Sequence, residues 1–358
     1  EHKSVCPDCS TGCSIYVDAN KDIVYRLRPR ENSEAQGYFM CDEGRFDYPY
    51  INSRERILRP LVRRKEQVAA SSAEEDIDGT LNATPEEDID GTLNAPASQR
   101  PSERQVPAAW EEVLPTLRRE LAEAAKDGGA VAAVLSPFLT CEEVYLLASY
   151  VKGLSPQARL ALGPIPVLGE DDTYPKDRRG RPLQPVKFTI RAEKCPNRRG
   201  VEEVLKHFQG EVIGFDEIVK AAGELKALYL TAGYSPRAGA WMKGEQIEAL
   251  RSIPLLIVQD LLPSAVSHAA KYVLPASSFA EKDGTFVNHA GLAQAIHRAA
   301  RPSHSCRTDG QIFMDLMQRR GLVHAPTLRS ELAAEVAYFA PLASGEIGEY
   351  GVRLEPAK

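Results

Sequence analysis

Apolar residues change their spacing along the chain, and each spacing predicts a different kind of element. Between residues 16 and 27 they form two short runs on either side of Ala19–Asn20, which predicts two strands joined by a turn. From Trp110 to Ala125 they recur at helical spacing, and a short apolar run over 130–135 predicts a buried strand. Helices and short strands then alternate toward the end of the chain. This alternation predicts an α/β fold with a mostly parallel sheet covered on both faces.

The rest of this body follows from local signals. Thr140 is placed to cap a helix that begins at Cys141, because its hydroxyl can accept a hydrogen bond from the first turn. Residues 154–200 are rich in Pro, Gly and Arg and are expected to form loops. Residues 281–285 are expected to form a turn in which Gly284 serves the backbone. The remaining expected elements are a mostly helical stretch over 201–225, strands over 226–232, 255–258 and 272–274, and helices over 311–319 and 328–339.

A stretch of different composition interrupts the pattern. Residues 66–107 contain no aromatic side chain, and the string EEDIDGTLNA occurs twice, at 74–83 and 86–95. An acidic repeat with so little to bury predicts a disordered linker. A calcium loop is the alternative, but the spacing of the acidic residues and the lack of a closing Glu do not fit a calcium-binding helix–loop–helix. We therefore expect a small domain over 1–60, an acidic linker over 61–107 and an α/β domain over 108–358.

Composition and charge exclude several classes of protein. The chain has 358 residues, which suggests two domains at roughly 150 residues each. With 43% hydrophobic and 26% charged residues, it has the composition of a folded protein. A formal net charge of -6 argues against a nucleic-acid binder, and no run approaches the roughly 20 apolar residues of a membrane span. No secretory signal is expected, and because residue 1 is Glu rather than Met we expect a fragment or a processed product.

The cysteines carry the chemical information. Four of the seven lie within the first 41 residues, with the spacing Cys6-x2-Cys9-x3-Cys13-x27-Cys41. Three closely spaced thiolates and one distant thiolate can ligate the four irons of a [4Fe–4S] cluster. Zinc is the alternative ion, but structural zinc sites usually show two paired knuckles, and the second half of this set has a single Cys.

Three parts of the chain resemble one known family. The segments S-V-C-P-D-C-S-T-G-C (4–13) and G-Y-F-M-C-D-E-G-R-F-D-Y (37–48), followed by Y-I-N (50–52), resemble the iron–sulfur segment that opens domains of the molybdopterin oxidoreductase superfamily. They are most similar to the large iron–sulfur subunit of bacterial NADH-quinone oxidoreductase, respiratory complex I. L-T-C-E-E (139–143) resembles the helix after that family's first sheet strand. V-L-P-A (273–276), F-A-E-K-D-G-T (279–285) and Asn288 resemble its VLP…E..GT..N signature.

This resemblance implies a fold, a cofactor and a set of partners. The fold would be a small N-terminal [4Fe–4S] domain followed by a degenerate molybdopterin-oxidoreductase-like α/β body. One [4Fe–4S] cluster would be ligated by Cys6, Cys9, Cys13 and Cys41. The chain would serve the peripheral arm of an NADH-quinone oxidoreductase in a structural and docking role with accessory electron transfer, without a catalytic residue or substrate site of its own. Its partners would be other iron–sulfur and flavin subunits of the NADH dehydrogenase, with no nucleic acid. The protein would be cytoplasmic, held at the cytoplasmic face of the inner membrane through its complex.

The chain also departs from this family. Members are usually longer and begin with a ferredoxin-like domain that holds a [2Fe–2S] cluster, so the main electron path would not run through this chain alone. Members that bind molybdenum or tungsten usually carry Lys or Arg two places after the fourth Cys, where this chain has Glu43, and an acidic side chain there would disfavour added electrons. Cys141 and Cys195 lack the context of a metal ligand and are expected to be buried and inert. We therefore expect no molybdopterin.

Two other functions remain open from the sequence. An electron-transfer subunit of a soluble NAD-linked hydrogenase or formate dehydrogenase complex would use the same cysteine segment. A structural interaction protein would bind zinc through these cysteines, or no metal at all.

Overall fold

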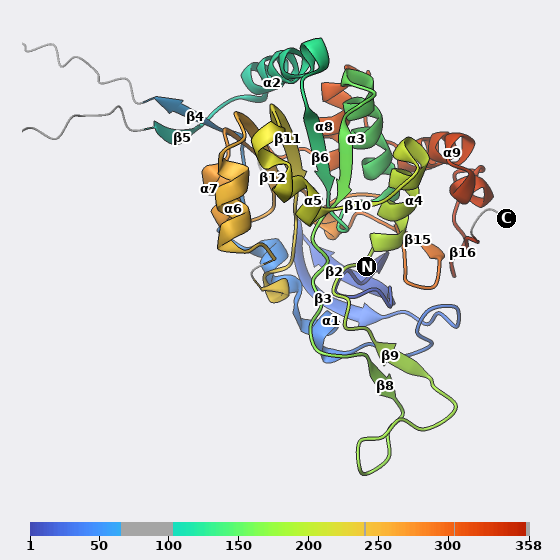
Figure 1. Ribbon diagram of the computed structural model, residues 1–358. Coiled ribbons are helices and arrows are strands. Elements are labelled where there is room, and N and C mark those ends of the chain that lie inside the picture. The colour runs from blue at the N-terminus through green and yellow to red at the C-terminus, as the bar shows by residue number, and fades with distance from the viewer. Residues whose placement is uncertain (66–102, 240, 304, 356–358) are drawn as a thin grey trace, which may run out of the picture.

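A large sheet with helices on both faces forms the body of the protein, and a small antiparallel sheet carrying the N-terminus lies against one end of it (Figure 1). The computed structural model describes residues 1–65, 103–239, 241–303 and 305–355. The α/β fold and its parallel-rich sheet confirm the prediction made from the spacing of apolar residues.

The large sheet has eight strands in the order β10-β7-β6-β11-β12-β13-β4-β5. From β10 to β13 neighbouring strands are parallel, whereas β4 and β5 are antiparallel to their neighbours. Because β6 comes first in the body and has β7 on one side and β11 on the other, the sheet is doubly wound. In sheet order the strands span Ile213–Gly214, Arg159–Leu162, Val131–Leu135, Ala227–Thr231, Leu255–Asp260, Tyr272–Pro275, Leu61–Lys65 and Glu103–Pro107.

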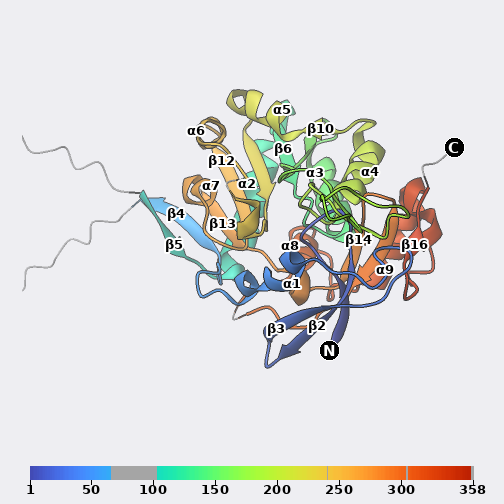
Figure 2. The same cartoon turned by 90° about the horizontal axis from the view of Figure 1, so that it is seen from below.

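Three smaller sheets complete the strands. They are β1 (His2–Val5), β2 (Ser14–Asn20) and β3 (Ile23–Pro29) at the N-terminus; β14 (Gly284–Val287), β15 (Leu292–Ile296) and β16 (Val352–Arg353); and the pair β8 (Asp172–Tyr174) and β9 (Phe188–Ile190). Figure 2 shows the body from below, with β2 and β3 beneath it.

Helices cover the two faces of the large sheet. One face packs against α2 (Trp110–Ala124), α3 (Cys141–Leu154), α4 (Arg198–Gln209), α8 (Asp309–Leu316) and α9 (Ala325–Glu335). The other packs against α5 (Phe215–Lys220), α6 (Gly244–Arg251) and α7 (Ala265–Ala269). A further short helix, α1 (Asp42–Phe46), lies in the N-terminal part with the 3₁₀ turn η1 (Tyr48–Asn52), and other 3₁₀ turns are η2 (Lys126–Gly128), η3 (Ala222–Glu224), η4 (Pro236–Ala238), η5 (Phe279–Glu281) and η6 (Ala337–Leu342). No helix in the described ranges is long and apolar enough to cross a bilayer.

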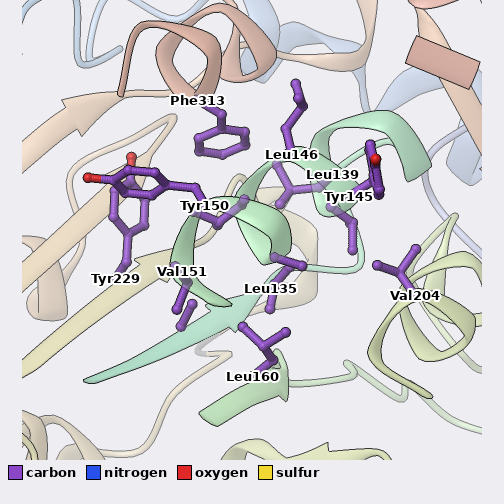
Figure 3. Packing of buried hydrophobic residues seen from close by; sticks show 14 of the residues in the cluster. Leu135, Leu139, Tyr145, Leu146, Tyr150, Val151, Leu160, Val204, Tyr229 and Phe313 are labelled. Carbon is purple, nitrogen blue, oxygen red and sulfur yellow. The ribbon is translucent and has the colours of Figure 1, made fainter. Parts of the chain in front are cut away.

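The central strands are buried because both faces of the sheet are covered. In β6 all five residues are buried, with Val131, Ala133 and Leu135 in one core and Ala132 and Val134 in the other. Figure 3 shows the first core around Leu135, where side chains of β7, α3 and α4 meet those of the central strands.

Several local predictions are confirmed and others differ. Thr140 caps α3 through a reciprocal pair of bonds with Glu143, as its position before the helix predicted. The turn between β2 and β3 lies at Lys21–Asp22, both with positive φ, rather than at Ala19–Asn20. The expected loop over 154–200 contains β7, a strand of the main sheet that is only four residues long, as well as β8 and β9.

The predicted linker differs from the structure at both ends. Residues 61–65 and 103–107 pair with each other as β4 and β5, and β4 joins the main sheet through β13. The acidic repeat between them lies outside the described residues. The two strands were missed because each is short and its neighbours are polar.

Buried ion pairs join the elements of the body. Glu142 of α3 accepts hydrogen bonds from the amide and hydroxyl of Thr285, at 2.8 and 2.6 Å, and its Oε1 lies 3.1 Å from Nε of Arg329. The Nζ of Lys282 lies 2.8 Å from Glu143 and 3.1 Å from Asp309. These are the residues of the L-T-C-E-E and E-K-D-G-T segments, so both segments serve the packing of α3 on β14.

Gly284 is required here for a reason other than the predicted one. Its φ is not positive, but a Cβ at this position would lie 2.4 Å from Cγ2 of Thr140. The glycine therefore permits β14 to approach the start of α3 closely.

A further buried pair ties the N-terminal part to the body. Nη2 of Arg56 lies 2.8 Å from Oε2 of Glu281, and both side chains are 3% exposed. The same guanidinium donates to the carbonyls of Ile51, at 2.7 Å, and Ala276, at 3.3 Å. Arg56 thus bonds η1 on one side and the end of β13 on the other.

We predict that Arg56→Met destabilises the protein by about 3–5 kcal/mol, because it leaves the Glu281 carboxylate buried without its cation. Chemical denaturation checks this through the free energy of unfolding. The double variant R56M/E281L should recover a large part of the loss, since no unpaired charge then stays buried. Equal stability of the single and double variants would contradict the role given to this pair.

Candidate iron–sulfur site

The first three cysteines lie on one loop between β1 and β2. The amide of Cys6 donates to the carbonyl of Cys13 at 2.8 Å, which closes the loop at its base. Gly12 has a φ of +66°, and a Cβ there would lie 2.8 Å from Cβ of Asn288. The loop therefore needs glycine at this position, both for its backbone and for its contact with the body.

The body holds this loop from outside. Nδ2 of Asn288 donates to the carbonyl of Thr11 at 2.9 Å, and Nε2 of Gln294 donates to the carbonyl of Gly12 at 2.7 Å. Both side chains are buried and come from the hairpin of β14 and β15. The Asn that ends the VLP…E..GT..N segment thus fixes the backbone that carries the cysteines.

Cys41 comes from a second loop and starts α1. Its sulfur accepts a hydrogen bond from the amide of Gly44 at 3.3 Å. A Cβ at Gly44 would lie only 2.7 Å from Sγ of Cys6. The absence of a side chain at Gly44 therefore lets the Cys41 loop pack directly on the first loop.

All four predicted ligand thiols are brought together. They are free, and Cys6, Cys9 and Cys13 are buried whereas Cys41 is half-buried. Burial raises the pKa of Cys6, Cys13 and Cys41, and the nearby thiols raise it further. Such thiols stay protonated on their own, so a metal must displace their protons when it binds.

The donor set fits an iron–sulfur cluster. Four thiols supply one ligand for each iron of a cube, and the Gly44 cradle leaves sulfur atoms unobstructed by a neighbouring side chain. In the described part of the chain, no group of three or more His, Cys, Asp or Glu residues is arranged around a single metal position. A cube does not need such an arrangement, because its thiolates bind four different irons.

Glu43, the residue that departs from the family pattern, is paired with two cations of the body. Its carboxylate oxygens lie 3.0 Å from Nζ of Lys194 and 2.7 Å from Nη2 of Arg237. Lys194 precedes α4 and Arg237 follows β11, so the sequence around Glu43 gives no sign of them. The negative charge expected to disfavour electrons is therefore offset by two positive charges.

Two further carboxyls were missed from the sequence. Asp8 lies between Cys6 and Cys9, and its Oδ2 is buried without a hydrogen-bond partner among the described residues. Burial, and then the charge of Asp47, raise the pKa of Asp8 to about 8. Both carboxyls line a small cavity with Lys194 and Arg237. Only the position of Asp8 between two ligands could have marked it.

The remaining cysteines lie outside this group of ligands. Cys141 and Cys195 are buried, as expected, and burial raises the pKa of both thiols well above the usual value. Sγ of Cys141 donates to Asn197 at 3.4 Å. Cys306 is half-buried against the carbonyls of Ile57 and Leu58.

Comparison with known families agrees with this geometry. Residues 1–53 match the molybdopterin oxidoreductase Fe4S4 domain, and residues 205–319 match the molybdopterin oxidoreductase family. The first match contains all four candidate ligands, and the second covers β11, β12, β13 and the signature segment. An iron–sulfur cluster is therefore supported for the N-terminal part.

Individual proteins show local similarity. The NADPH-Fe(3+) oxidoreductase subunit alpha of Geobacter sulfurreducens is 39% identical over 123 residues, which is 33% of this chain and 14% of that protein. The large iron–sulfur subunit of NADH-quinone oxidoreductase from Escherichia coli (strain K12) is 36% identical over 79 residues, 22% of this chain and 9% of that protein. Acetylene hydratase from Pelobacter acetylenicus superposes on 90% of this chain and 69% of its own, with a TM-score of 0.47 and 8% identity.

The aligned part thus spans only a small fraction of these curated relatives, 14% and 9% of their lengths. Within that span the matches confirm the predicted resemblance. The chain is similar to iron–sulfur oxidoreductase subunits of the molybdopterin oxidoreductase superfamily, and among them to the large iron–sulfur subunit of NADH-quinone oxidoreductase.

Proposed function

We propose that Cys6, Cys9, Cys13 and Cys41 hold one [4Fe–4S] cluster, and that the chain is an iron–sulfur subunit in the peripheral arm of an NADH-quinone oxidoreductase. The observation that carries this proposal is the gathering of four free thiols on two loops that pack against each other. The match of residues 1–53 to an Fe4S4 domain and the similarity to the large iron–sulfur subunit of that enzyme support it.

In this role the chain's own residues hold and shield the cluster. A bound cluster would supply a site that gains or loses one electron. Asn288 and Gln294 fix the first loop, and Glu43 ties the Cys41 loop to Lys194 and Arg237. These bonds keep the four sulfurs in place and place two positive charges near them.

The proposed role is mainly structural and for docking, with accessory electron transfer. We propose that residues 1–60 form the cluster domain, that 108–358 form a degenerate body without a substrate site or a molybdopterin, and that 61–107 connect the two. The partners would be flavin and iron–sulfur subunits that bring the chain to the cytoplasmic face of the inner membrane.

A second candidate is favoured by the similarity to the Geobacter protein. The chain would then be the electron-transfer subunit of an NAD(P)H-linked oxidoreductase without membrane subunits. Proteins that copurify with the native chain distinguish the two: quinone-linked membrane subunits support the first candidate, and a soluble catalytic subunit supports the second.

Metal analysis tests the cofactor directly. Anaerobically purified protein should contain about four irons per chain and neither molybdenum nor tungsten, because one cube takes four thiolates. Elemental analysis, with electron paramagnetic resonance after dithionite reduction, checks this. Stoichiometric molybdenum or tungsten would replace the proposal by a catalytic oxidoreductase, and zinc alone would leave a structural role.

Replacing one ligand should affect both iron and folding. We predict that Cys41→Ser loses most of its iron and melts at a lower temperature, because metal binding contributes to the stability of this small domain. Iron content and thermal unfolding check this. Cys306→Ser, a half-buried thiol outside the site, is the matched control and should keep both at wild-type values. Wild-type iron and melting temperature in C41S would contradict the proposal.

The Gly44 cradle allows a variant that retains all four ligands. In Gly44→Ala the new Cβ would meet Sγ of Cys6, at 2.7 Å in the present backbone. A free thiol can rotate away, whereas a sulfur bound to iron cannot, so we predict lower iron occupancy with unchanged secondary structure. Iron content and circular dichroism check this. Gly223→Ala, where nothing lies within 4 Å of the new Cβ, is the control. Full iron content in G44A would show that this contact is not needed.

A further inference from the structure

A two-stranded arm projects from the body beside the N-terminal part (Figure 1). It consists of β8, β9 and the connecting residues 175–187, and we call it the basic arm. Its tip has a defined turn: Oδ1 of Asp177 accepts bonds from the amides of Arg179, at 2.8 Å, and Arg181, at 2.9 Å.

The base of the basic arm is anchored next to the cysteine loops. The buried ring of Phe188 stacks on Phe39, two residues before Cys41, with centroids 5.8 Å apart. Oγ1 of Thr11, on the first cysteine loop, donates to the carbonyl of Thr189 at 2.7 Å. Any protein bound to the arm would therefore lie close to the candidate cluster.

The charge of the basic arm is opposite to that of the whole chain. Residues 176–187 contain five basic side chains and one acidic side chain, whereas the chain has a net charge of -6. Arg178, Arg179 and Lys187 are exposed and make no ion pair with any residue that the structure describes. Three positive charges thus remain available at the tip.

Exposed apolar side chains lie on and near the arm. On the arm itself, Leu183 and Val186 are exposed. Tyr38 and Phe46, on either side of Cys41 in the sequence, are 72% and 65% exposed. Arg and aromatic residues together are enriched at protein interfaces.

We propose that the basic arm docks an electron-carrier protein with an acidic surface, so that the carrier lies beside Cys41, the least buried of the four thiols. This inference rests on the proposed function, and it names the kind of partner that exchanges electrons at the site. One electron leaves the reduced carrier and is taken up at the cluster, and no bond or proton changes place. An acidic carrier is favoured over an anionic membrane because a lipid surface could not exchange electrons with the cluster that the arm adjoins.

The test uses a reduced or oxidised plant-type [2Fe–2S] ferredoxin as the acidic probe, with the full chain. Binding of oxidised ferredoxin is measured by calorimetry at low and high salt, and reduction of the chain by reduced ferredoxin is followed by stopped-flow absorbance. For R178Q/R179Q/K187Q we expect binding about tenfold weaker at low salt, a correspondingly slower second-order reduction, and loss of most of the salt dependence.

The matched control removes three exposed basic side chains elsewhere on the body, as K220Q/K243Q/R320Q. Its binding and rate should stay within about twofold of wild type, because steering depends on where the charge lies. Equal losses in both variants, wild-type behaviour of the arm variant, or a wild-type chain that fails to bind ferredoxin would overturn the proposal. Dimerisation, or binding to vesicles of phosphatidylglycerol and phosphatidylcholine, that depends on the arm while ferredoxin binding does not would also overturn it.

The two proposals fail in different ways. A chain without iron refutes the cluster, yet calorimetry with oxidised ferredoxin still decides whether the arm binds an acidic carrier. A chain with four irons whose reduction by ferredoxin is unaffected by the arm variant refutes the docking proposal alone.

Discussion

Charges removed from water must be paired, and this constraint fixes the junction between the cysteine loops and the α/β body. Arg56, Glu281, Lys282 and the two glutamates at the start of α3 are almost fully buried. Each has a partner on another element, so α3, β14 and the end of β13 cannot shift independently without leaving a charge unpaired. The cysteine loops rest on this junction through Asn288 and Gln294. The geometry of the candidate site is therefore set by residues more than 250 positions away in the sequence.

The sequence motifs of the resemblance acquire separate physical roles in this arrangement. The cysteine segment supplies the thiols, whereas the L-T-C-E-E and E-K-D-G-T segments supply the buried pairs that hold the body together. Asn288 joins the two groups, because it comes from the body and bonds the backbone of the cysteine loop. A body of this kind can keep its motifs for packing even where it performs no chemistry, which agrees with the structural and docking role proposed for the chain.

Features encoded locally could be predicted from the sequence, and features that depend on distant partners could not. The strand at 131–135 and the Thr140 cap follow from neighbouring residues. The spacing of the four cysteines was sufficient to select the thiols that the fold brings together. The cations beside Glu43 were not predictable, because Lys194 lies 151 positions away and reaches it only through the fold. β7 was missed because four residues carry too little periodicity to distinguish a strand from a loop.

The pairing of β4 with β5 also bears on how this protein can change over time. Lys65 lies opposite Glu103, so the chain leaves the sheet and returns to it at the same point. Closing a longer connection between two adjacent strand ends costs only about 0.6 kcal/mol for each doubling of its length. A duplication such as EEDIDGTLNA could therefore enter here without disturbing a single contact of the core. The edge of this sheet is a place where the gene can gain or lose short repeats while the fold remains under unchanged selection.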